Sequence, residues 1–66
     1  MDSELNDLLF EIEDAFSRIN SRIYYIKNNE ILYELFDWFK YLELDCNDLN
    51  FYTRALRDKL NESEIL

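Results

Sequence analysis

The hydrophobic positions in the first 26 residues recur with the spacing of a coiled coil. From residue 5 they advance by alternating steps of four and three, at Leu5, Leu9, Ile12, Phe16, Ile19, Ile23 and Ile26. These steps keep the side chains on one face of an α-helix. The pattern predicts a long first helix that ends in the polar segment "KNNE". There we expect Asn28 to stop the helix in a left-handed conformation and Asn29 to cap the next helix; the alternative is one continuous helix through both residues.

Two shorter helices are predicted after this turn. The first runs from about residue 30 to residue 44, and its apolar side chains cover an arc of roughly 160° at about 100° per residue. They are Ile31, Leu32, Leu35, Phe36, Trp38, Phe39 and Leu42. An arc this wide can contact two neighbouring helices, so we expect most of it to be core. Asp45 can cap a third helix, whose inner face would carry Leu49, Tyr52, Leu56 and Leu60.

The absence of glycine and proline favours helices over hairpins of strands. The predicted fold is therefore all-α, a small three-helix bundle in one domain spanning residues 1–66, with one long helix followed by two shorter ones. The long helix would measure about 36 Å and the other two roughly 22 to 25 Å. The seam near Ile19, Ile23 and Ile26 would then be unmatched. We expect a homodimer through the first helix; the alternatives are a docking site for another protein and a longer third helix.

Charge and composition narrow the function. The 66 residues include 15 acidic and 7 basic side chains, for a net charge of −8. Direct binding to nucleic acid is disfavoured, because it depends on cations that contact phosphate. With no histidine and a single cysteine, the chain lacks the usual residues of zinc sites and of nucleophile–base pairs. We predict no enzymatic activity, no cofactor and no metal.

The single cysteine and the lack of an apolar span or signal peptide predict a soluble cytoplasmic protein, located in the host cytoplasm if a phage encodes it. No membrane partner is expected, because acidic residues open the first helix and anionic lipid would repel them.

The acidic residues follow helical stripes. On the first helix Glu4, Asp7, Glu11 and Asp14 are three or four residues apart, and on the second Glu30, Glu34 and Asp37 repeat the spacing. Like charges at this spacing destabilise an isolated helix slightly, so local stability does not account for them. Successive carboxylates rise about 4.5 to 6 Å along the axis, similar to the phosphates of one nucleic-acid strand. The alternative is that these are ordinary solvated faces, with Glu11 and Asp14 within reach of Arg18 or its neighbours for surface ion pairs.

Aromatic side chains lie beside these acids, and exposed aromatics next to charge are typical of protein interfaces. The predicted partner-binding residues are Glu4, Asp7, Phe10, Glu11, Asp14, Tyr25, Glu30, Tyr33, Glu34, Asp37 and Tyr41.

These features favour a small acidic inhibitor or modulator that binds a basic protein surface, such as the nucleic-acid groove of a host defence or DNA/RNA-processing enzyme. In size, charge and helicity the chain resembles the small acidic proteins that phages and mobile elements use against nucleases and CRISPR systems, although no motif assigns it to a family. One alternative is a homodimeric helical adaptor or a transcriptional or replication regulator. Another is an immunity protein or antitoxin for a basic toxin.

Overall fold

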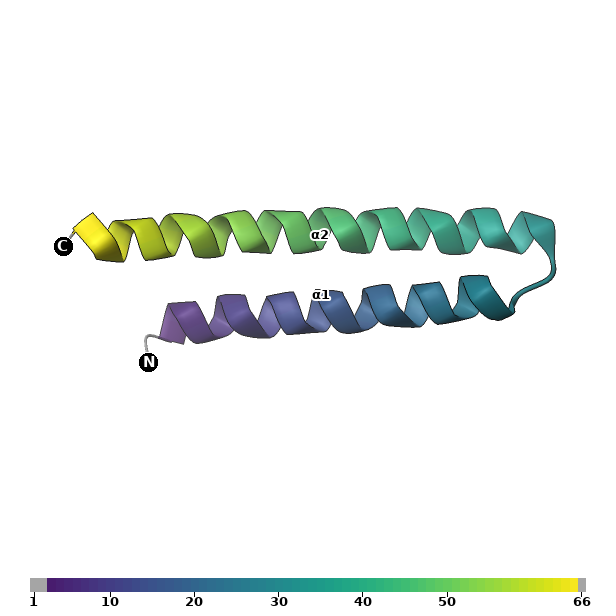
Figure 1. Ribbon diagram of the computed structural model, residues 1–66, viewed down its shortest axis with the longest axis horizontal. Helices are drawn as coiled ribbons and strands as arrows, with labels where there is room; N and C mark the ends of the chain where they lie inside the picture. Colours follow the sequence, from purple (N-terminus) through teal and green to yellow (C-terminus); the bar gives the residue numbers. More distant parts are fainter. Residues whose placement is uncertain (1–2, 66) are drawn as a thin grey trace.

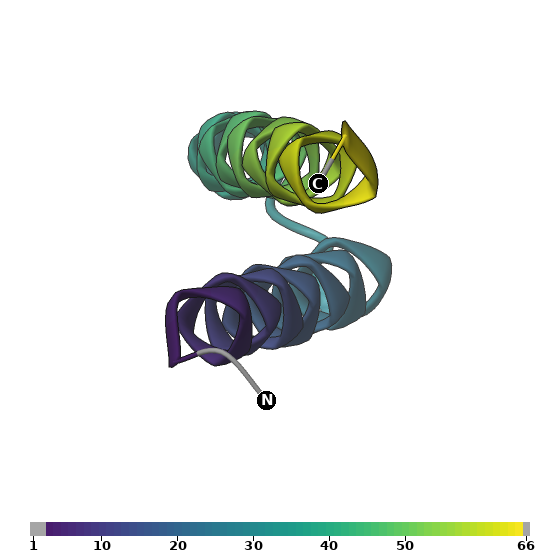
Figure 2. The same cartoon turned by 90° about the vertical axis from the view of Figure 1, so that its left-hand side faces the viewer.

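The chain folds as a hairpin of two antiparallel helices (Figure 1). The computed structural model describes the backbone of residues 3–65 and the side chains of residues 3–62. Helix α1 spans Ser3–Asn28 and helix α2 spans Leu32–Ile65. The two helices lie side by side along their length in both views (Figures 1 and 2), in a molecule with extents of 53 × 16 × 12 Å. The described residues include no strand, so the all-α prediction is confirmed.

The prediction of three helices is not confirmed, because α2 runs without a break through the expected start of a third helix at Asp45. Asp45 does not cap a helix end; it lies in the middle of α2 and is only 6% exposed. The physical reason is a second continuous series of steps of three and four. This α2 seam comprises Leu32, Leu35, Phe39, Leu42, Cys46, Leu49, Thr53, Leu56 and Leu60. An uninterrupted helix retains all its backbone hydrogen bonds, and that outweighs the capping ability of one aspartate.

The predicted turn after Asn28 is confirmed, but its chemistry differs from the prediction. No described residue has a positive φ, so the left-handed stop at Asn28 is wrong. Instead the Asn28 side-chain amide donates to the carbonyl of Tyr24 at 2.8 Å. The Asn29 Oδ1 accepts from the backbone N–H of Ile31 at 2.9 Å. Glu30, expected on the second helix, lies in this linker.

The contact between the helices is thin. Ala15 is the one fully buried apolar side chain among the described residues. The expected core of the second helix is largely open: Phe36, for example, is 66% exposed, and Leu32 and Phe39 are exposed as well. That core prediction was wrong for the single chain because it relied on a third helix. Two cylinders touch along one line, so a wide apolar arc on either helix stays partly uncovered.

Candidate protein-interaction surfaces

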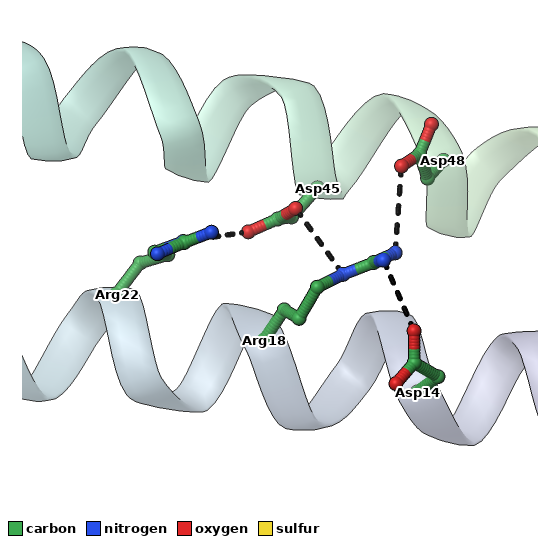
Figure 3. Close-up of polar contacts among 5 residues, drawn as sticks. All are labelled: Asp14, Arg18, Arg22, Asp45 and Asp48. Atoms are coloured by element: carbon green, nitrogen blue, oxygen red, sulfur yellow. Dashed lines mark hydrogen bonds and ion pairs between the residues drawn. The ribbon is translucent and has the colours of Figure 1, made fainter.

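An ion-pair network joins the two helices at the middle of the hairpin (Figure 3). Arg22 Nε donates to Asp45 Oδ2 at 3.0 Å. Arg18 Nε lies 3.3 Å from Asp45 Oδ1, a contact that has the distance of an ion pair but not the angles of a hydrogen bond. One nearly buried carboxylate of α2 is therefore shared by two guanidinium groups of α1. Such sharing fixes how the helices face each other, because both arginines must point inward to reach Asp45.

Two further carboxylates extend the network outward. Arg18 Nη1 lies 3.0 Å from Asp14 Oδ2 on its own helix, and Arg18 Nη2 lies 3.4 Å from Asp48 Oδ2 on α2. Asp14 was predicted to be part of an acidic stripe, with a surface pair to Arg18 as the alternative, and the structure shows this pair. The stripe is therefore partly neutralised where it approaches the middle of α1.

Aromatic rings pack beside this network, near the linker end. The Tyr25 ring stacks on Trp38 with centroids 4.5 Å apart and planes at 11°. Tyr41 meets Trp38 edge to face at 6.0 Å. The Arg22 guanidinium carbon lies 5.7 Å from the Trp38 centroid and 5.0 Å from that of Tyr41, within cation–π range. Tyr25 and Tyr41, predicted to bind a partner, thus hold α1 against α2 with about half of their surface still exposed.

Other predicted residues also make contacts within the hairpin. Glu4 pairs with Lys59 of α2. The Glu34 carboxylate accepts from Asn29 Nδ2 at 2.9 Å in the linker, and Glu11 is half-buried. Five of the predicted residues are exposed without such a contact, namely Asp7, Phe10, Glu30, Tyr33 and Asp37. The predicted set is therefore divided between residues that hold the hairpin and residues that face solvent.

One group of predicted residues lies together on α1, and all of them except the half-buried Glu11 are exposed. We call Asp7, Phe10, Glu11 and Asp14 the acidic surface. Phe10 is 66% exposed, and Asp7 and Asp14, three residues before and four after it, are its neighbours on the helix. Asp7 and Glu11 form no ion pair with any described residue, and α1 carries no basic side chain before Arg18. The role of the acidic surface in binding a partner stays a prediction.

The described residues contain no group of histidine, cysteine and acidic side chains placed to hold a metal ion. In the same part of the chain, neither helix combines the length and apolar character needed to cross a membrane. Comparison with protein-family models, curated proteins and solved structures gave no match to this chain.

Sequence reasoning missed the Asp45 network and the α2 seam. The signal for the network was the spacing of Arg18 and Arg22, which puts two cations one turn apart on the inner side of α1. The signal for the seam was the unbroken alternation of three and four across Asp45. Cys46 and Thr53 obscured it because neither is a large aliphatic side chain.

Proposed function

We propose that this protein is a small acidic inhibitor or modulator that binds a basic protein surface through the acidic surface of α1. One observation carries the proposal: an exposed Phe10 lies between Asp7 and Asp14, and neither Asp7 nor Glu11 has an ion-pair partner among the described residues. An aromatic anchor surrounded by charge complementary to the partner supports both specificity and fast association.

The proposed partner is a basic protein, and its nucleic-acid groove is the surface that fits best. The acidic surface lies on a straight helix, where carboxylates four residues apart rise about 6 Å. A basic groove that accommodates phosphates at comparable intervals offers matching cations. The net charge of −8 would also draw the two proteins together over distance. A phage or mobile-element origin, with a host defence enzyme as target, is part of this proposal and rests on size and composition.

A second candidate is a homodimeric helical adaptor or regulator. It is favoured by the α2 seam, which α1 covers only in part: Leu32, Phe39 and Leu60 remain exposed. The two candidates use different surfaces, so variants can separate them.

The test of the first candidate compares proteins retained by the immobilised chain and by single variants. Asp7→Lys and Phe10→Ala alter the acidic surface. Glu43→Lys and Phe51→Ala are the matched controls on α2, since Glu43 is exposed and Phe51 is 66% exposed, the same as Phe10. Far-ultraviolet circular dichroism of each variant verifies that the hairpin is intact.

We expect a basic protein to be retained at low salt, released at high salt and displaced by duplex DNA. Asp7→Lys and Phe10→Ala should each lose it, while both controls keep it. The proposal fails if the two acidic-surface variants retain the protein as well as the unmodified chain does, or if the controls lose it equally.

A further inference from the structure

We infer that a second copy of this chain covers the apolar flank of the hairpin, so that two hairpins form an antiparallel four-helix bundle. The flank consists of the α2 seam and the α1 seam, the latter being Leu5, Leu9, Ile12, Phe16, Ile19, Ile23 and Ile26. This inference concerns a surface other than the acidic surface, so it does not depend on the proposed inhibitor function. It specifies the interface that the second candidate, a homodimeric adaptor or regulator, would use.

Both seams lie on the same side of the hairpin. Ala15 and Asp45 are the most buried positions of their helices and mark the direction of the opposite helix. At about 100° per residue, each seam is centred roughly 70° further round than these positions. Because the helices are antiparallel, equal rotations bring the two seams to one flank. An apolar groove confirms this near the linker, since it is lined by Ile26 of α1 and by Leu32, Leu35, Phe36 and Phe39 of α2.

The contact between the two helices covers this flank only in part. None of the side chains in either seam is buried, and Phe16, Leu32, Phe39 and Leu60 are exposed. A strict alternation of three and four is what helices need in order to interdigitate with neighbours in a bundle. In this chain both helices carry the alternation, but each helix packs against a neighbouring helix on only one side.

The surface area indicates how much is left to cover. The chain exposes 5431 Å². A compact protein of 8.2 kDa would expose about 4,500 Å². The excess, about 900 Å², matches the roughly 800 Å² that each partner buries in a stable interface of standard size.

The dimensions lead to the same conclusion. The radius of gyration is 15.4 Å, whereas a compact 66-residue domain would have about 11 Å and one of twice that length about 14 Å. The radius of gyration of the hairpin already exceeds that of a compact protein of twice its length, and a second hairpin would add thickness without adding length.

A second copy is the occupant that fits the charge pattern. No seam position carries a charged side chain, although the chain has a net charge of −8. Two copies can therefore meet at this flank without burying an unpaired charge, which would cost several kcal/mol. Asp7 and Asp14 lie roughly opposite the α1 seam on the helix, so this part of both acidic surfaces would face outward. A twofold pairing of identical seams is also complementary by symmetry.

Sedimentation equilibrium tests the inference. We expect a mass of about 16.4 kDa, twice the 8.2 kDa of one chain. Phe39→Glu puts a charge on the α2 seam and should abolish the dimer. Phe51→Glu, on a ring off the seam that is also exposed, should leave the dimer unchanged. A mass of 8.2 kDa for the unmodified chain, or a dimer that Phe51→Glu disrupts and Phe39→Glu does not, would overturn the inference.

The Phe39→Glu chain is also expected to lose stability, so a second measurement uses the unmodified chain alone. For a dimer, a hundredfold rise in chain concentration should raise the Tm by roughly 10 °C, through mass action on association. A Tm that does not change with concentration would overturn the inference.

Discussion

Replacing Asp45 by asparagine removes one negative charge from the centre of the hairpin and keeps the shape of the side chain. Asp45 has the lowest exposure of any charged residue that the structure describes, and it neutralises both Arg18 and Arg22. After the change, the two guanidinium groups face an amide across the helix interface. Arg18 keeps Asp14 and Asp48, but Arg22 loses its one carboxylate partner among the described residues and must remain under-compensated or turn toward solvent. The loss of this pair weakens the contact between α1 and α2.

The size of the expected loss in stability depends on how exposed the two arginine side chains are. Breaking a fully buried ion pair costs about 3 to 5 kcal/mol. Here the Arg18 and Arg22 side chains are 35% and 28% exposed, so water screens part of the loss. We expect Asp45→Asn to lower the free energy of unfolding by about 2 kcal/mol. The total free energy of unfolding of a 66-residue chain is only about 3 to 10 kcal/mol, so a loss of this size should be readily measured.

Urea unfolding followed by circular dichroism, at one fixed chain concentration, measures this loss. Asp48→Asn is the control, because Asp48 also contacts Arg18, at 3.4 Å, but its side chain is 53% exposed. It should cost less than about 0.5 kcal/mol. Equal losses for the two variants, or no loss for Asp45→Asn, would refute the claim that Asp45 contributes more to stability than Asp48 because it is more buried.

Two further predictions concern the close packing of the helices at Ala15 and the linker at Asn29, and the same urea assay checks both. Ala15→Leu should lower the free energy of unfolding by about 1 to 3 kcal/mol, because the larger side chain forces the helices apart. Ser17→Leu, on the exposed side of α1, should change it little, and equal effects of the two substitutions would contradict the close packing at Ala15. Asn29→Ala should cost about 1 kcal/mol through loss of its bonds to Ile31 and Glu34, while Asn20→Ala within α1 should stabilise slightly. An unaffected Asn29→Ala chain would mean that the linker does not define the start of α2.

The first helix and the turn could be predicted because local signals determine them. The regular apolar spacing from Leu5 to Ile26 ends where Asn28 and Asn29 offer side-chain hydrogen bonds to the backbone. The break at Asp45 was predicted from a residue type that often caps helices, yet the same side chain serves two arginines of the other helix. A local signal cannot distinguish these roles, because the second depends on which residues the hairpin brings opposite each other.

The same limit applies to the candidate site. That Tyr25 would stack on Trp38, and that Glu4 would meet Lys59, depends on the length of the linker and the register it imposes. The exposure of Asp7 and Phe10 was predictable, because neither lies on the apolar face of α1. Charge spacing alone therefore selected residues of both kinds, and the structure was needed to separate those that hold the hairpin from those that face solvent.

An isotope-filtered nuclear Overhauser experiment on a mixture of labelled and unlabelled chains tests most directly whether two copies pair through their seams. It records contacts between copies and no others. We predict such contacts at seam side chains, including Phe16, Phe39 and Leu49, and none at Asp7 or Phe51. Contacts between copies centred on Phe51 or Phe10, or the absence of any such contact in a folded sample, would contradict the claim that the hairpin keeps one flank for its own copy and the acidic surface for a partner.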